Sequence, residues 1–161
     1  MSDDMQMPQP TAEHELLQKA VGTWDVAGKF WMDPSQPPME TTGSEVVTAL
    51  GGFWIEGVYT SEFFGHPFEG HAGATFDPVK QHYVTTWRDS ISPTFFHMAG
   101  QMEDDTLTCT GTAPDCSTGQ DAMHRSVETG CGTDHRVFSM YMTPAGGEEI
   151  KMMELTYSRR S

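Results

Sequence analysis

The 161-residue sequence contains few cysteines, few basic residues and no long hydrophobic run. Its three cysteines, Cys109, Cys116 and Cys131, are odd in number and lack C-x-x-C spacing, which argues against a disulfide framework and a structural zinc site. We expect free thiols. No segment approaches the ~20 apolar residues of a membrane-spanning helix, and the first residues lack the basic and apolar regions of a signal peptide. These absences favour a cytoplasmic protein.

Basic side chains are scarce, because Lys and Arg total 9 whereas Asp and Glu total 23, which gives a formal net charge of -14. Proteins bind nucleic acid by neutralising phosphates with Lys and Arg, and no basic stripe is present here. The same negative sign disfavours an anionic membrane surface. We therefore expect no nucleic-acid partner and no membrane partner, and we interpret the acidic residues as a source of solubility.

Histidine pairs with metal-site spacing are also missing. A zincin helix carries a second histidine four residues after the first, but after His14 that position holds Gln18. We interpret His14 as a helix-face histidine that contacts its neighbours. His66 is predicted in a Gly-His-Pro turn and His71 on a strand, with Glu69 between them, so their side chains need not converge. We expect no metal site.

Motifs for nucleophilic or phosphate chemistry are absent from the sequence. There is no G-x-S-x-G elbow, and Ser90 follows Asp89 without a histidine nearby in sequence. The glycine-containing run at 129–133 lacks the lysine of a P-loop and precedes a strand, so we interpret it as a hairpin connection. The sequence therefore identifies no catalytic residue.

The residues that are present predict one small domain with a largely aromatic core. A chain of this length suits one domain, and 4 Trp, 9 Phe and 4 Tyr supply large apolar side chains. We interpret residues 1–10 as a flexible leader and residues 11–161 as a single β-barrel domain. One helix is predicted from about Thr11, a good N-cap, to about Ala20, before Gly22 stops it.

Everything after this helix alternates between apolar and polar residues with period two, with short connections rich in turn-forming residues. No helical periodicity separates the strands, which excludes a parallel α/β sheet. Ten such strands close into an up-and-down barrel or pack as two sheets, and closure is favoured because it removes exposed edges. We predict an all-β, about ten-stranded antiparallel lipocalin-like barrel with one short N-terminal helix. The predicted strands are 23–32, 39–50, 53–63, 69–76, 82–89, 94–102, 106–113, 123–129, 136–142 and 149–158.

Several short motifs resemble one protein family across nearly the whole chain, from about residue 8 to about residue 158. The Gly22-x-Trp24 pair is similar to the start of the first strand in lipocalin-type barrels, which implies that Trp24 plugs the closed end. The wider set resembles the bacterial domain of unknown function 1579 family, which implies a calycin-like barrel and no assigned activity. The further motifs are Pro10-Thr11-x-Glu13-His14, Gln36-Pro37-Pro38-Met39, Gly43-x-Glu45, Leu50-Gly51-Gly52-x-Trp54, Phe76-Asp77-Pro78 and Tyr83-Val84-x-Thr86-Trp87-x-Asp89-Ser90.

The sequence also resembles the haem-binding nitrobindin barrel, but it lacks the residues that mark the haem site of that family. That family carries several further glycines after the tryptophan and a histidine haem ligand late in the chain. In this sequence only Gly28 follows in the first strand, and the final histidine, His135, precedes the last strand. We therefore expect no haem and no other cofactor.

The predicted strand at 82–89 provides the clearest candidate site, because its two faces differ. One face carries Tyr83, Trp87 and Asp89, whereas the other carries Arg88, a residue type that is rarely buried unpaired. The first face should therefore point into the barrel, with Trp87 in the lumen wall. Asp89 then either caps the following turn or meets a ligand near a barrel mouth. Further lumen candidates are Trp54, His71 and His97.

Three functions are compatible with such a barrel. In the first, its aromatic and methionine-rich interior binds a small, largely apolar molecule. In the second, an enzyme uses the same cavity, with Asp89, His97 or His71 as acid and base. In the third, the barrel is packed and acts as an interaction domain. The sequence leaves the ligand and the oligomeric state open, a homodimer included.

Overall fold

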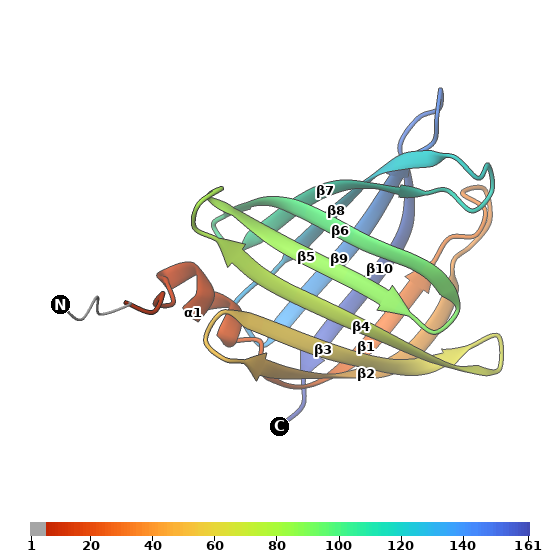
Figure 1. The fold of residues 1–161 in the computed structure, drawn as a ribbon. Helices are drawn as coiled ribbons and strands as arrows, with labels where there is room; N and C mark the ends of the chain where they lie inside the picture. The colour runs from red at the N-terminus through yellow and green to blue at the C-terminus, as the bar shows by residue number, and fades with distance from the viewer. Residues whose placement is uncertain (1–5) are drawn as a thin grey trace.

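The computed structural model describes residues 6–161, so half of the expected leader at residues 1–10 lies outside the described residues. Within this part, ten strands form a closed barrel and one helix lies at one end of it (Figure 1). The elements are α1 (Ala12–Gln18), β1 (Gly22–Phe30), β2 (Met39–Leu50), β3 (Trp54–Phe63), β4 (His66–Asp77), β5 (His82–Asp89), β6 (Ser92–Glu103), β7 (Thr106–Pro114), β8 (Asp121–Thr129), β9 (His135–Thr143) and β10 (Ile150–Arg159).

The strands follow an up-and-down order around the barrel. Each strand pairs antiparallel with the next in sequence, and β1 pairs with β10 to close the sheet. Closure leaves no strand with an unpaired edge. The predicted all-β antiparallel barrel with one short helix is thereby confirmed, and β2 and β5 have the predicted bounds.

The largest difference in strand bounds concerns the start of β4, which begins at His66 and not at residue 69. Phe64 and Gly65 have φ values of 51° and 75°, and His66 pairs directly with Phe63. Two successive positive φ values are the geometry of a type I′ hairpin turn. The turn therefore falls on Phe64 and Gly65, and the expectation that His66 lies in a turn is wrong.

Helix α1 begins at the predicted N-cap, Thr11, but ends at Gln18 before the predicted boundary. After it, the Ala20 amide donates to the Leu17 carbonyl (3.0 Å) and the Val21 amide to the Gln18 carbonyl (3.1 Å). These three-residue spacings tighten the chain into a 3₁₀-type turn, which ends the α-helix early and leads into β1. No helix among the described residues is long and apolar enough to cross a membrane.

Alternate residues of each strand point into the barrel, as the pleat requires. Their buried apolar side chains form two clusters, one that includes Trp24 on β1 and one that includes Phe76 on β4. The first cluster consists of Trp24, Val26, Val47, Tyr59, Leu155 and Tyr157. The second consists of Phe76, Tyr83, Met98, Leu107, Cys109 and Met140.

Candidate functional site

The inner face of β5 carries the residues that the sequence analysis oriented inward. Tyr83 is opposite Phe76 in the β4–β5 ladder, and Trp87 is opposite Ala72, so both share the face of the buried Phe76. Tyr83 is buried, and Trp87 is partly buried against the cluster that includes Trp24. Asp89 is two residues beyond Trp87 and therefore lies on the same face, at the end of the strand.

The other three lumen candidates, Trp54, His71 and His97, lie on the outer face. Each alternates with inward residues: Trp54 precedes Ile55, which packs against the cluster that includes Trp24, His97 lies between Phe96 and Met98, and His71 follows the buried Gly70. A solvated histidine on the outer wall avoids the cost of desolvating its ring nitrogens. The expectation that these three side chains line the lumen is therefore corrected, and the two histidines cannot face Asp89 inside the barrel.

The part of the chain that the structure describes holds no group of side chains arranged to bind a metal ion. His71 Nε2 approaches only Glu69 Oε2, at 3.2 Å on the exposed outer wall. His66 and His71 differ by an odd number of residues on β4, so they point to opposite faces. No cluster of three or more His, Cys, Asp or Glu side chains that could hold a metal forms among residues 6–161.

Four aromatic side chains on β3, β4 and β5 form a wall that reaches the barrel mouth, the end opposite α1. Phe68 stacks on Trp87 with ring centroids 6.4 Å apart and planes 19° apart. Tyr59 contacts both rings, at 5.9 Å and 6.4 Å, and Phe63 contacts Phe68 at 6.1 Å. We call Tyr59, Phe63, Phe68 and Trp87 the aromatic wall. Tyr59 is buried, whereas the other three are only partly buried.

Asp89 holds one member of this wall in place. Its Oδ2 accepts a hydrogen bond from Trp87 Nε1 (2.8 Å), and its Oδ1 accepts one from the Ile91 amide (3.1 Å). The second bond is the turn-capping role that the sequence left as one alternative for Asp89. Both carboxylate oxygens thus have partners within the chain, and Asp89 orients the Trp87 indole at the mouth.

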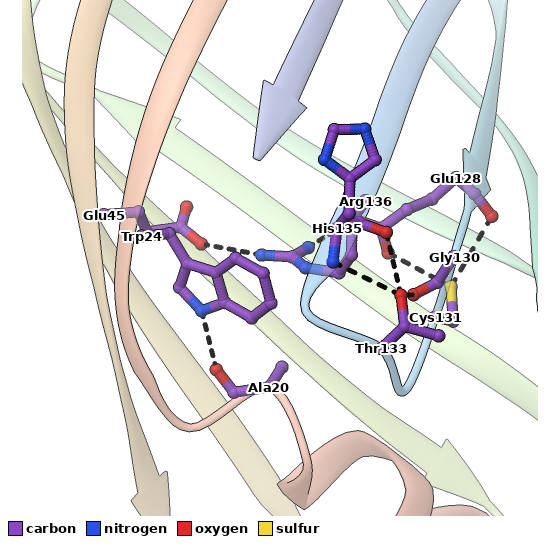
Figure 2. A network of polar contacts seen from close by, with 9 residues as sticks. All are labelled: Ala20, Trp24, Glu45, Glu128, Gly130, Cys131, Thr133, His135 and Arg136. Carbon is purple, nitrogen blue, oxygen red and sulfur yellow. Dashed lines mark hydrogen bonds and ion pairs between the residues drawn. The ribbon is translucent and has the colours of Figure 1, made fainter. Parts of the chain in front are cut away.

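A buried charged cluster lies deeper in the barrel, between β2, β8 and β9. Arg136 on β9 is 7% exposed, and its Nη1 donates to Glu128 Oε1 at 2.6 Å. Its Nη2 approaches Glu45 Oε1 to 3.7 Å, an ion pair without a hydrogen bond. Figure 2 shows the guanidinium extending from β9 toward Glu45 across the Trp24 ring. We call Glu45, Glu128 and Arg136 the polar cluster.

Two aromatic rings enclose the guanidinium of the polar cluster. The Arg136 Cζ atom lies 4.2 Å from the centroid of the Trp24 ring and 4.3 Å from that of Tyr157. Such contacts favour a cation more strongly where water is excluded. Trp24, the expected plug, is fully buried, and its Nε1 donates to the Ala20 carbonyl (2.9 Å) where the chain leaves α1.

Burial shifts the pKa values of two groups in and beside the polar cluster. Burial raises the pKa of Glu45 from 4.5 to about 7; Arg136 opposes this rise, and Glu128 adds to it. Burial likewise raises the pKa of the Tyr157 hydroxyl well above its ordinary value, with Glu45 contributing. Glu45 is therefore a carboxyl group that titrates near neutrality inside the barrel.

Cys131 lies beside Glu128, next to the polar cluster. Its Sγ lies 3.5 Å from the Glu128 main-chain carbonyl and 3.5 Å from its Oε2. Burial raises the pKa of Cys131, and that of Cys109 to about 11, so both are protonated thiols at neutral pH. All three cysteines are free: Cys109 is buried, Cys131 is partly buried and Cys116 is exposed.

Several polar atoms inside the barrel have no hydrogen-bond partner. Among residues 6–161, every buried side-chain nitrogen or oxygen without a partner belongs to a residue on the inner face. Buried polar groups in native proteins nearly always have partners, supplied by the chain, by water or by a bound molecule. The atoms are Thr41 Oγ1, Tyr59 Oη, Thr85 Oγ1, Arg136 Nε and Arg136 Nη2.

The polar cluster was not predicted from the sequence, although the sequence holds a signal for it. Glu45 alternates with Val47 on β2, and Arg136 alternates with Phe138 and Met140 on β9, so each charge occupies an apolar face. A charged residue at an inward position of a strand is rare unless it is paired. Two or three such positions in one barrel would have predicted an internal ion pair.

The fold and family of the chain are matched by known proteins. A family described as "Protein of unknown function (DUF1579)" matches residues 9–159. The crystal structure of Rv2717c from M. tuberculosis is similar, with a TM-score of 0.66 and 12% identity, over 95% of this chain and 100% of that one. The structure of EF1p2_mFAP2b bound to DFHBI is also similar, with a TM-score of 0.50 and 12% identity, over 92% of this chain and 100% of that one. No curated protein matches the chain.

Proposed function

The chain belongs to the DUF1579 family of proteins of unknown function, and we propose that its barrel binds one small, largely apolar molecule that carries a polar group. The unpartnered polar atoms on the inner face carry this proposal. Each buried donor or acceptor without a partner costs about 1–3 kcal/mol, and a ligand that supplies the missing hydrogen bonds recovers that cost. Tyr59 and Arg136, at 4% and 7% exposure, contribute three of these atoms.

The aromatic wall supports a planar or aliphatic apolar body for the ligand. Its members Phe63, Phe68 and Trp87 remain partly exposed although they face inward, and they lie toward the mouth. Binding sites for small molecules are mostly apolar and aromatic, with a few fixed polar groups. The aromatic wall and the polar cluster together have this composition.

One similar barrel, EF1p2_mFAP2b, is described as bound to DFHBI. That likeness is one of fold at 12% identity, so it supports the capacity of such a barrel to hold a small molecule and says nothing of which one. The class of ligand proposed for this chain is inferred from the residues on its own inner face.

Native mass spectrometry of the protein purified from its source organism tests the proposal directly. We expect a bound small molecule, and we expect an aromatic probe such as 2-methylnaphthalene to compete for its place. A change in Trp87 fluorescence shows that the probe contacts the aromatic wall. Comparison with Trp87→Phe identifies the part of the tryptophan signal that comes from Trp87.

Matched variants locate the binding. Ala72 faces inward opposite Trp87, so Ala72→Leu fills space beside the aromatic wall, whereas Ala27→Leu adds the same group to the outer face. We expect Ala72→Leu to weaken probe binding by about tenfold or more and Ala27→Leu to leave it unchanged. Equal effects of the two variants, or a protein that binds nothing in either experiment, would contradict the proposal.

A further inference from the structure

We propose, on the basis of the ligand-binding function above, that the molecule held in the barrel is a monocarboxylic acid with an apolar body. Its carboxyl group binds the free edge of Arg136 and shares one proton with the Glu45 carboxyl. The ligand carboxyl group thereby accepts hydrogen bonds from the two Arg136 nitrogens that have no partner within the protein.

The free edge of Arg136 has the geometry that binds two oxygens. Nε and Nη2 lie on the same side of the planar guanidinium, and neither has a hydrogen-bond partner. The chain uses the same edge elsewhere, because Arg125 Nε and Nη2 donate to Glu149 Oε2 (3.0 Å) and Oε1 (2.7 Å). Two parallel donors of this kind match a carboxylate better than they match a single carbonyl oxygen.

The polar cluster does not satisfy this edge by itself. Glu128 binds the third nitrogen of Arg136, Nη1. Glu45 remains 3.7 Å from Nη2, and its carboxyl group packs against β3, where a methyl group at Gly57 would come within 2.9 Å of Glu45 Cδ. The Glu45 carboxyl therefore lies beside the Arg136 edge without closing it.

Charge decides the protonation state of the complex. Glu128 already balances Arg136, so a ligand carboxylate next to an ionised Glu45 would place two like charges together in a buried site. One proton held between the two carboxyl groups removes that repulsion. Because the pKa of Glu45 is about 7 before the ligand binds, the proton is already present below that pH and is taken from solvent above it.

Groups from several strands face Glu45 and influence this proton. Arg136 stabilises the ionised carboxyl, Glu128 disfavours it, and burial disfavours it most. Burial holds the pKa of the Tyr157 hydroxyl well above its ordinary value, so Tyr157 adds no charge, and Arg159 contacts the Trp24 ring. The titratable and charged groups around Glu45 are Arg136 on β9, Glu128 on β8, Tyr157 and Arg159 on β10, Tyr59 on β3, and Cys131 beside Glu128.

Tyr59 connects the two parts of the binding site. Its hydroxyl is one of the unpartnered buried atoms, and its ring contacts Phe68 and Trp87 of the aromatic wall. A ligand whose carboxyl group lies at Arg136 therefore extends its apolar body along the aromatic wall toward the mouth.

Calorimetric titration with three probes of one shape tests the inference: 2-naphthoate, 2-naphthamide and 2-methylnaphthalene. We expect 2-naphthoate to bind the wild-type protein at least about tenfold more tightly than 2-naphthamide at about pH 6. Uptake of one proton predicts that 2-naphthoate affinity falls about 100-fold between about pH 6 and about pH 9, while 2-naphthamide affinity stays constant.

Two variants on β2 separate the roles. Glu45→Gln keeps the shape and removes the titration, so 2-naphthoate affinity should become independent of pH; Glu40→Gln, on the outer face of the same strand, should behave as the wild type. Arg136→Lys, which lacks the two-donor edge, should lose the preference for 2-naphthoate over 2-naphthamide. If Arg136→Lys does not fold, the pH profiles of 2-naphthoate binding by the wild type and Glu45→Gln still test the inference.

The outcomes distinguish this inference from the proposed function. If all three probes bind equally and without pH dependence, the carboxylic acid and the shared proton are wrong and the ligand-binding function stands. A preference for 2-naphthamide identifies a neutral acceptor as the ligand group and likewise overturns the inference. If none of the probes binds, both proposals fail together.

Discussion

At the scale of single residues, His14 joins α1 to the barrel through both of its ring nitrogens. Its Nδ1 accepts from the Thr11 amide (2.9 Å), which leaves the Nε2 proton to be donated to the Phe76 carbonyl (2.9 Å). The first bond takes the place of the Glu or Gln in a capping box, and the second spans 62 residues. The neutral ring with its proton on Nε2 is therefore the form that fits.

Replacing His14 with phenylalanine should destabilise the protein by about 1–3 kcal/mol, because an aromatic ring is kept while the partly buried Thr11 amide and the buried Phe76 carbonyl lose their partner. Urea unfolding followed by circular dichroism measures the change. Glu15→Gln, at the exposed neighbouring position, is the control and should cost less than half as much. Equal stability of His14→Phe and the wild type would show that the two bonds do not fix α1.

The raised pKa of Glu45 predicts a pH dependence of stability with a definite sign. The folded protein holds the Glu45 proton up to about pH 7, whereas the unfolded chain releases it near 4.5. The stabilisation is therefore complete below about pH 4.5 and is lost as the pH rises through about 7. The difference between the two pKa values corresponds to about 3 kcal/mol.

Comparison with Glu45→Gln isolates this contribution from the other acidic residues. The free energy of unfolding of the wild type, relative to that of the variant, should fall by up to about 3 kcal/mol between about pH 4 and about pH 8. Urea titrations at several pH values give both curves. Parallel curves across this range would mean that Glu45 is ionised in the folded protein.

At the scale of elements, the close approach of the β4 backbone to the Trp87 indole of the aromatic wall depends on one glycine. A methyl group at Gly70 would overlap the far edge of the Trp87 indole, which Asp89 holds by its hydrogen bond. Gly70→Ala should therefore displace Trp87 and cost about 1–3 kcal/mol. Thermal unfolding and Trp87 fluorescence report the two effects.

Gly147→Ala is the matched control for this prediction. It lies in the β9–β10 connection, where an added methyl group meets only ordinary van der Waals neighbours, and its φ is not in the left-handed region. This variant should leave stability unchanged or raise it slightly. A Gly70→Ala protein with wild-type stability and fluorescence would indicate that Trp87 adopts another position.

The elements themselves follow from local pattern, whereas their partners across the barrel do not. Period-two alternation at 82–89 predicts β5 and the inward side of Trp87, because each strand's apolar face must be buried. The opposite orientation of Trp54 and His97 depends on register with neighbouring strands, which single-strand composition does not encode. The inward positions of Glu45 and Arg136 can be inferred from the alternation within each strand, but that their ion pair joins β2 to β9 depends on the closed barrel.

At the scale of the whole molecule, nine of the ten strand pairings join neighbours in sequence and one pairing, β1 with β10, closes the barrel. Contacts between distant residues form late in folding because closing a long loop costs conformational entropy. Val26 on β1 belongs to this closing pair and lies opposite Tyr157 on β10. Val47 on β2 lies opposite Gly57 on β3, in a hairpin of neighbouring strands.

Truncating each of these buried valines to alanine should cost about 2 kcal/mol. Val26→Ala should mainly raise the unfolding rate, while Val47→Ala should also slow folding. Stopped-flow folding and unfolding in urea separate the two rates. If Val26→Ala slows folding as much as Val47→Ala, the β1–β10 pairing is already formed in the transition state.

The even number of strands has a practical consequence. Because β1 begins and β10 ends beside α1, the opposite end of the barrel carries only hairpin connections among residues 6–161 (Figure 1). A tether attached after Ser161 would therefore fix the protein to a sensor chip in a single orientation, with the barrel mouth directed into the flowing solution. Immobilisation through this end leaves the route to the aromatic wall open to any molecule injected over the surface.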